Sequence, residues 1–190
     1  MQDSNDLYIL LTDTGTLFSK MIKFFTKAPY NHVSIGFDHE LKELYSFGRK
    51  KPYNPFVAGF VKENIRHVVF CHAKCALYRF QVDSHQRAGI YHLVKKLYHE
   101  REQYKYNLLG LMGVLLKKDF NRKKAFFCSQ FIATVLAENG LQLVQKPPAF
   151  TTPADFQEVL ASQIIFEGTM GELLIKNGEM DLLSAGTLPA

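Results

Sequence analysis

The sequence predicts an α+β fold in which an antiparallel sheet or barrel packs against an apolar helix. Three observations support this prediction: apolar runs of strand length recur in the first 82 residues, helix-like spacing appears in other segments, and the helices are segregated from the strands. With 190 residues, 47% of them hydrophobic and 22% charged, the chain suits one globular domain. We expect residues 1–6 and 177–190 to be peripheral to it.

The strands are expected mainly in the first half of the chain. Short apolar or alternating runs predict them at residues 7–11, 32–37, 42–48, 65–70 and 76–82, with two more near 164–166 and 173–175. Residues 32–37 and 42–48 are separated by a polar turn, which indicates a hairpin. Between Arg49 and Asn64, prolines and glycine predict a loop, and a loop of that length is often a binding element.

Helices are expected where apolar residues recur every three to four positions. They are predicted at residues 16–26, 84–102, 108–116, 128–139 and from 153 onward. Ser84 and Thr152 are suitable N-caps, and Pro153 suits a first helical position. Residues 108–116 are apolar nearly all round, so we expect a buried helix there, with shallow membrane contact as the alternative.

The net charge of +5, from 23 basic and 18 acidic residues, is unevenly distributed. Lysines alternate with phenylalanines over 18–27, and a second basic cluster occupies 117–124. These clusters are typical of a solvated face and are compatible with peripheral contact with an anionic membrane. No nucleic-acid motif accompanies them, so we expect no nucleic-acid partner.

Cysteine content and the absence of an export signal favour a cytoplasmic protein. There is no signal peptide, no apolar run long enough to span a bilayer, and only three cysteines. Cys71 and Cys75 lack a second ligand pair with zinc-site spacing, and we interpret them as structural thiols. We expect no metal or cofactor.

Cys128 and His32 are the candidate catalytic residues. Cys128 lies where a predicted helix begins, and the unpaired N–H groups and dipole of a helix start favour a thiolate. His32 is the best-placed imidazole to exchange protons with it. In a strand, His32 and Ser34 share a face opposite Val33, so the histidine can line a cleft while Val33 enters the core.

The predicted hairpin suggests which residue orients the imidazole. With the turn centred on His39, His32 lies opposite Ser46, which makes Ser46 the third member of a triad. A slip of one residue would instead bring Glu43 to the histidine face. The sequence leaves the two alternatives open.

Four motifs carry a resemblance to a known family. They are Asn-His-Val-Ser-Ile-Gly at 31–36, Tyr-Asn at 106–107, Phe-Cys-Ser-Gln-Phe at 127–131 and Thr-Pro-Ala-Asp-Phe at 152–156. In this order they resemble the circularly permuted papain-like NlpC superfamily, most nearly the YiiX/YaeF type of amidases and peptidases and more distantly the lecithin retinol acyltransferase type. The resemblance covers residues 8–156.

The resemblance implies a permuted papain-like fold with Cys128 as nucleophile and His32 as base. It also implies a cysteine amidase or peptidase that passes through a thioester, acting on a peptide, amide or acyl-lipid substrate. The chain departs from the family at Ser46, Gln130 and Asn107, where acidic residues are usual. A lipid acyltransferase or thioesterase of the same fold, or a non-catalytic peptide- or lipid-binding module, is the alternative.

Overall fold

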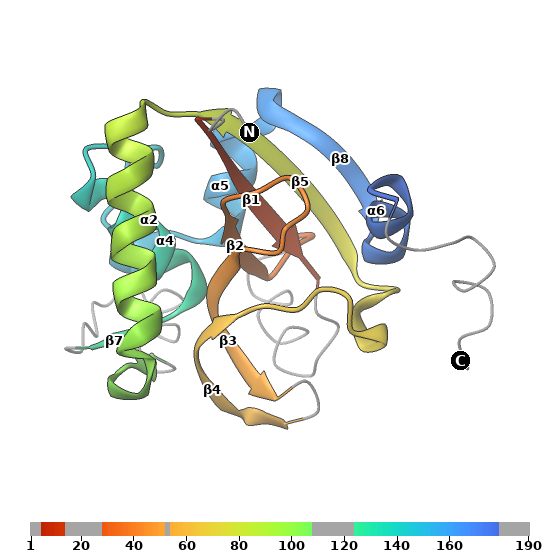
Figure 1. The fold of residues 1–190 in the computed structure, drawn as a ribbon, viewed down its shortest axis with the longest axis horizontal. Coiled ribbons are helices and arrows are strands. Elements are labelled where there is room, and N and C mark those ends of the chain that lie inside the picture. The colour runs from red at the N-terminus through yellow and green to blue at the C-terminus, as the bar shows by residue number, and fades with distance from the viewer. Residues whose placement is uncertain (1–4, 14–27, 52–53, 108–123, 179–190) are drawn as a thin grey trace.

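The protein is described by a computed structural model, in which residues 5–13, 28–51, 54–107 and 124–178 are described (Figure 1). A six-stranded sheet forms its centre, in the order β4-β3-β2-β1-β5-β8, and every neighbouring pair is antiparallel. The strands are β1 (Asp6–Thr12), β2 (His32–Gly36), β3 (Leu44–Lys51), β4 (Asn54–Lys62), β5 (Lys74–Gln81) and β8 (Ile164–Thr169). The predicted α+β class with an antiparallel sheet is confirmed.

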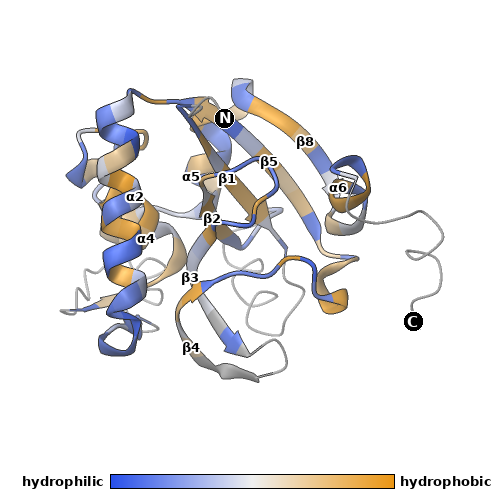
Figure 2. Cartoon of the chain, viewed as in Figure 1, coloured by the Kyte–Doolittle hydropathy of each residue, from blue (hydrophilic) through white to orange (hydrophobic). Residues whose placement is uncertain are grey.

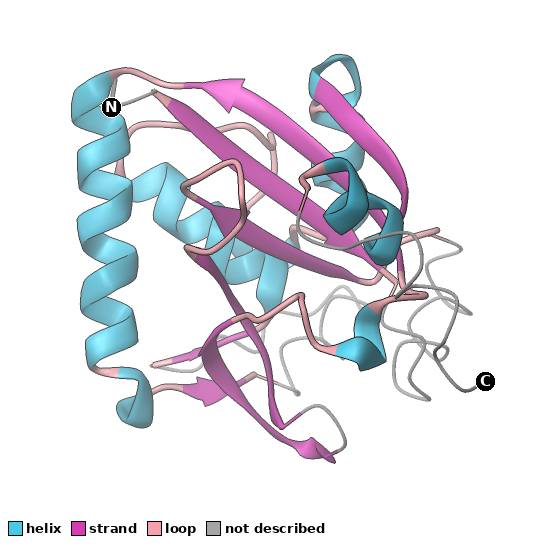
Figure 3. Cartoon of the chain, turned by 45° about the vertical axis from the view of Figure 1, so that its right-hand side comes forward, coloured by secondary structure: helices cyan, strands magenta, loops and turns pink. Residues whose placement is uncertain are grey.

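Helices cover both faces of the sheet. The α-helices in the described residues are α2 (Ser84–His99), α4 (Cys128–Glu138), α5 (Pro153–Val159) and α6 (Met170–Lys176). In Figure 1, α2 and α4 lie on one side of the sheet and α6 lies on the other, beside β8. A short parallel ladder of β6 (Lys105–Tyr106) and β7 (Ala125–Phe126) leads into α4, as Figure 3 shows.

The central strand β1 separates two hydrophobic clusters. Its side chains alternate, so Leu7, Ile9 and Leu11 join the cluster under α2 and α4, whereas Tyr8 and Leu10 join the cluster under α6. All seven residues of β1 are buried. This explains why its sequence is a continuous apolar run, visible as an orange strand in Figure 2.

The predicted loop over residues 49–64 is wrong. Strand β3 continues to Lys51 and β4 begins at Asn54, so most of the segment forms a second hairpin. Pro52 and Pro55 suggested a loop, but β4 is an edge strand of the sheet, where proline is tolerated because fewer ladder hydrogen bonds are required. The consequence for function is that the residue following β4 is held rigidly beside β3.

Two shorter strand predictions are also wrong. Residues 65–70 form turns and a 3-10 helix over Val68–Phe70, in which Val68 and Val69 are exposed. Residues 173–175 belong to α6, whose start is fixed by a capping box between Thr169 and Glu172. In both segments the short apolar run is compatible with a strand and with a short helix. The helices predicted at 16–26 and 108–116 lie outside the described residues.

Replacing Gly171 with alanine is expected to lower the free energy of unfolding by about 1–3 kcal/mol. The added Cβ would lie 2.6 Å from Sγ of Cys71 and 3.2 Å from its carbonyl oxygen, which accepts a hydrogen bond from the Gly171 N–H. Chemical denaturation of Gly171→Ala, Cys71→Ala and the double variant tests this. The double variant should be more stable than the sum of the single effects predicts; strict additivity would contradict the contact.

Candidate active site

A buried ion pair between His32 and Glu63 forms the centre of the candidate site. Nε2 of His32 lies 2.6 Å from Oε1 of Glu63, and the two side chains are only 14% and 18% exposed. His32 is the first residue of β2, and Glu63 directly follows β4. The Glu63 N–H donates to the Leu44 carbonyl, which continues the β3–β4 ladder by one residue.

The register of the sheet explains why these side chains meet. Ile35 pairs with Tyr45 and Gly36 with Leu44, so the same register places Ser34 opposite Ser46 and His32 opposite Gly48. The β3–β4 pairing places Ser46 opposite Val61, one diagonal step from Glu63. His32, Ser34, Ser46 and Glu63 therefore share one face of three neighbouring strands.

The predicted role of Ser46 as the direct orienter of His32 is corrected by these contacts. Ser46 does share the face of His32, but the hairpin register differs by two residues from the predicted one, and the Ser46 hydroxyl donates to Oε1 of Glu63. The carboxylate stands between the serine and the imidazole. The alternative, Glu43, instead accepts hydrogen bonds from Tyr45, Lys62 and Lys95.

The pKa values of the pair favour two charged partners. Burial lowers the pKa of His32, but the Glu63 charge, the influence of Cys128 and the hydrogen bond that Glu63 accepts outweigh it and raise the pKa to about 10. Burial raises the pKa of Glu63, but the charge and hydrogen bond of His32 and the two serine hydroxyls bring it below its usual value. Both directions of shift favour the ion pair of imidazolium and carboxylate over the neutral pair.

Cys128 reaches the other side of the imidazole from the first residue of α4. It lies close enough to His32 to raise the pKa of the imidazole, and because Nε2 faces Glu63, the ring nitrogen left for the sulfur is Nδ1. Phe131, Ile132 and other apolar residues of α4 pack into the core and fix the helix against β2 and β3. Cys128 and His32, the two predicted site residues, are thus brought together.

The N-terminus of α4 carries no side-chain cap. Its N-cap residue is Phe127, which cannot accept a hydrogen bond through its side chain, whereas α2, α5 and α6 each begin with a capping box. The first N–H groups of a helix have no partner within the helix. Cys128 is the first residue of α4, so its side chain lies at the end of the helix where such donors can bind a negatively charged oxygen.

Two neighbouring segments hold this helix start in place. The buried Ser129 hydroxyl donates to the Thr151 carbonyl at 2.7 Å, and Thr152 and Asp155 form the capping box of α5. The Asp155 carboxylate also accepts from Lys146. The Thr-Pro-Ala-Asp-Phe motif thus forms the capped start of α5, directly after the residue that anchors α4, and within the described residues none of its side chains is hydrogen-bonded to His32.

Tyr106 is a further polar residue of the site. It pairs with Phe126 in the β6–β7 ladder, two residues before Cys128. Burial, and to a smaller extent the electrostatic effect of nearby Cys128, raise the pKa of Tyr106, so the phenol can donate its proton in a hydrogen bond. Neighbouring Asn107 is buried, and its N–H donates to the Phe126 carbonyl.

Glu63 is the site residue that sequence reasoning missed. It lies inside the segment interpreted as a loop, so its position relative to His32 was not considered. The available signal was the run Phe-Val-Ala-Gly-Phe-Val at 56–61, which has the composition of a strand and ends two residues before Glu63. A strand there would have paired with 42–48 and placed the carboxylate near the histidine.

Replacing Gly48 with alanine is expected to reduce kcat/KM for any substrate by about tenfold without unfolding the protein. The new Cβ would lie 3.3 Å from Cε1 of His32 and 3.2 Å from the Ser46 hydroxyl, so the imidazole would have to shift. Gly59→Ala is the matched control, because Gly59 pairs with Gly48 and its Cβ would approach only the flexible Lys50 side chain closely. Equal losses of kcat/KM in the two variants would contradict the expected displacement of the His32 imidazole.

The remaining two cysteines lie away from the candidate site. Cys71 and Cys75 are free and buried, and Cys75 packs in the cluster under α6, on the other face of the sheet from α4. Among the described residues, no group of three histidine, cysteine or acidic side chains is placed to hold a metal, and no helix has the length and apolarity to cross a membrane. The basic clusters lie outside the described residues except at Lys124.

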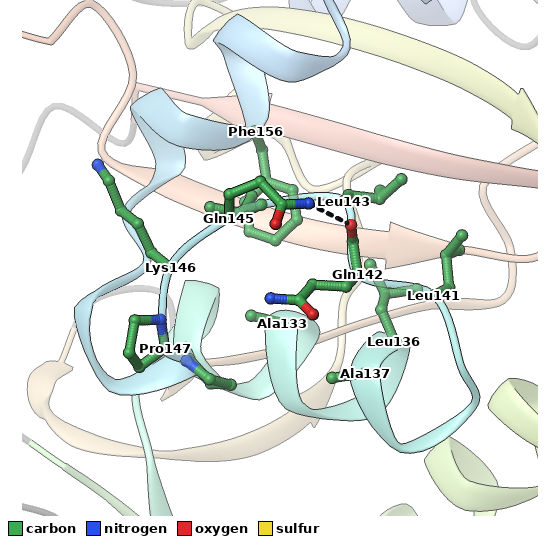
Figure 4. Close-up of a pocket in the computed structure, with 12 residues that line it drawn as sticks. Ala133, Leu136, Ala137, Leu141, Gln142, Leu143, Gln145, Lys146, Pro147 and Phe156 are labelled. Atoms are coloured by element: carbon green, nitrogen blue, oxygen red, sulfur yellow. Dashed lines mark hydrogen bonds between the residues drawn. The ribbon is translucent and has the colours of Figure 1, made fainter.

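A hollow of about 350 Å³ runs along the C-terminal half of α4 (Figure 4). Its walls include Ala133 and Ala137 of that helix together with Leu141, Pro147 and Phe156. Cys128, His32 and Glu63 do not line it. The hollow is therefore separate from the candidate active site.

Comparison of the chain with models of protein families, with curated proteins and with solved structures gives no match. The fold and the site together define an α+β protein with a buried Cys-His-Glu cluster at the start of an uncapped helix.

Proposed function

We propose that the protein is a cysteine hydrolase, an amidase or peptidase, that uses Cys128 as nucleophile, His32 as acid and base, and Glu63 as the residue that orients His32. One observation carries the proposal: Cys128, at the start of α4 where there is no side-chain cap, adjoins an imidazole whose Nε2 is held by a buried carboxylate. Nucleophile, base and orienter in that order are the components of covalent acyl transfer.

The proposed reaction follows from the charges of the site. The thiolate of Cys128 attacks the carbonyl carbon of an amide, and the carbonyl oxygen becomes an oxyanion held by the free N–H groups of α4. The intermediate collapses, the C–N bond breaks, and His32 gives its proton to the departing amine. Neutral His32 then takes a proton from water, whose oxygen attacks the thioester and releases the acid and the thiolate.

A permuted papain-like fold is part of the proposal. Its support is the order of the elements, with the histidine strand β2 preceding the nucleophile helix α4, and an antiparallel sheet packed against that helix. In this proposal Glu63, which follows β4, takes the role of the acidic residue that the family carries on the strand after the histidine strand, where this chain has Ser46. Tyr106 stands beside Cys128 as an additional donor.

Trapping the acyl-enzyme tests the proposal. The protein is incubated with N-acylated peptide amides and with matched esters, quenched in acid, and digested for mass spectrometry. We expect the acyl group on the peptide containing Cys128, turnover of amides, and loss of both in Cys128→Ala. Turnover that proceeds equally well in Cys128→Ala would contradict the assignment.

A further inference from the structure

Two buried serines converge on the carboxylate that orients the imidazole. The Ser34 hydroxyl donates to Oε2 of Glu63 at 2.8 Å, and the Ser46 hydroxyl donates to Oε1. Both serine residues are 0% exposed. Oε1 also faces Nε2 of His32, so both oxygens of the carboxylate have donors. The sequence interpretation assigned Ser46 to the histidine and Ser34 to no function.

The two buried hydroxyls do more than fill space in the sheet. A serine that is fully buried in a sheet costs free energy unless its hydroxyl is bonded, and alanine or glycine would fill the space without that cost. Both hydroxyls could have bonded to backbone carbonyls, as Ser129 does with Thr151. They instead donate to one charged group, where a hydrogen bond is roughly twice as strong as one between neutral groups.

We propose that Ser34 and Ser46 are positioning residues that keep Glu63 ionised and aligned on His32, and that they thereby set the acidic limit of the activity. The role in activity rests on the proposed hydrolase function, whereas the role at Glu63 does not. Each hydroxyl stabilises the carboxylate more than the carboxylic acid, because the neutral acid is the weaker hydrogen-bond acceptor. Without them, Glu63 would take up a proton at a higher pH, and His32 would lose its partner.

Among the groups around Glu63, the two serines and His32 are the ones that stabilise its ionised carboxylate. His32 of β2 faces it directly, and beyond His32 lie Cys128 of α4 and Tyr106 of β6. Lys62, the residue before Glu63, forms its ion pair with Glu43 instead. Within the part of the chain that the structure describes, no lysine or arginine is paired with Glu63, so the hydroxyls are its neutral donors and His32 is its cationic one.

Carboxyl-carbon NMR tests the proposal directly. Protein labelled at the glutamate side-chain carboxyl is titrated, and the Glu63 signal is assigned by its absence in Glu63→Gln. We expect the titration midpoint of Glu63 to rise by about one pH unit in Ser34→Ala and in Ser46→Ala, and further in the double variant. Ser129→Ala, another buried serine variant, should leave the midpoint unchanged.

The outcomes separate this role from the proposed function. A midpoint in the single variants within about 0.2 pH unit of the wild type would overturn the proposal. If the midpoint rises and the acidic limit of kcat/KM rises with it, while the alkaline limit stays, the full proposal holds. If the midpoint rises in a protein without hydrolase activity, the serines hold Glu63 but the part of the proposal concerning activity is overturned.

Discussion

Cys128→Ala is expected to abolish turnover, with a loss in kcat of at least about 10³-fold, while the fold stays intact. The loss is large because the variant removes the atom that bonds to the acyl carbon, and no other thiol can replace it: Cys75 lies in the cluster on the other face of the sheet. The fold should persist because alanine keeps the Cβ of the cysteine and removes only the sulfur. Steady-state kinetics and thermal unfolding measure both effects.

Cys71→Ala is the control for this variant. Cys71 is as buried as Cys128 but contacts Gly171 of α6, so its loss should leave kcat unchanged and lower stability slightly. Comparable activity losses in the two variants would show that the thiols act only through stability. Retention of turnover in Cys128→Ala would instead remove the nucleophile from the mechanism.

Glu63→Gln is expected to move the alkaline limit of activity down by several pH units. The Glu63 charge is the largest cause that raises the pKa of His32 to about 10, and without it only Cys128 would oppose burial, so that pKa should fall toward its ordinary value of 6.5. His32 would then be neutral at pH 8, the thiolate would lose its cationic partner, and activity there would fall more than at pH 6. The pH dependence of kcat/KM measures this shift.

The same variant should change how stability depends on pH. His32 has a raised pKa in the folded protein, so its stabilising contribution is complete below about 6.5 and is lost as the pH rises through about 10. Glu63 has a lowered pKa, so its contribution is present above its ordinary value of 4.5 and is lost as the pH falls through the folded value. In Glu63→Gln the alkaline loss should disappear.

Glu43→Gln is the control for the carboxylate. Glu43 is paired with Lys62 and Lys95 away from the imidazole, so its removal should leave the alkaline limit of activity in place. An equal displacement in the two variants would mean that general surface charge, and not the ion pair with His32, determines the limit. An unchanged limit in Glu63→Gln would contradict the role assigned to Glu63.

The sequence predicts the elements with strong local signals. The apolar run of β1, the amphipathic helix α2, the helix that begins at Cys128 and the Thr152 cap of α5 are found where they were expected. The predicted cap of α2 is wrong, because Asp83 and not Ser84 accepts from the Gln86 N–H, and the helix ends at His99 and not near 102. These elements are specified by residues close to one another in the chain. The side of β2 that faces the core, with Val33 and Ile35, could be predicted for the same reason.

The third site residue could not be predicted because it depends on pairing between strands. Glu63 comes beside His32 only because β3 pairs with β2 on one side and with β4 on the other, in registers that no local signal determines. Prolines at 52 and 55 obscured β4, since an edge strand accepts residues that an interior strand would exclude. The two buried serines were expected on the face of His32, but their bonds to Glu63 depend on the same pairing and could not be predicted.

We propose that His32 activates Cys128. Alkylation of the three cysteines tests this activation without a substrate. All three side chains are similarly buried, at 6%, 0% and 4% exposure for Cys71, Cys75 and Cys128, so access alone does not separate them. Native protein at pH 7 is treated with iodoacetamide, and the modified cysteines are followed by peptide mass spectrometry. We predict that Cys128 reacts at least about tenfold faster than the others, and that His32→Ala removes this preference. Equal labelling of the three cysteines, or a preference that persists in His32→Ala, would contradict the claim.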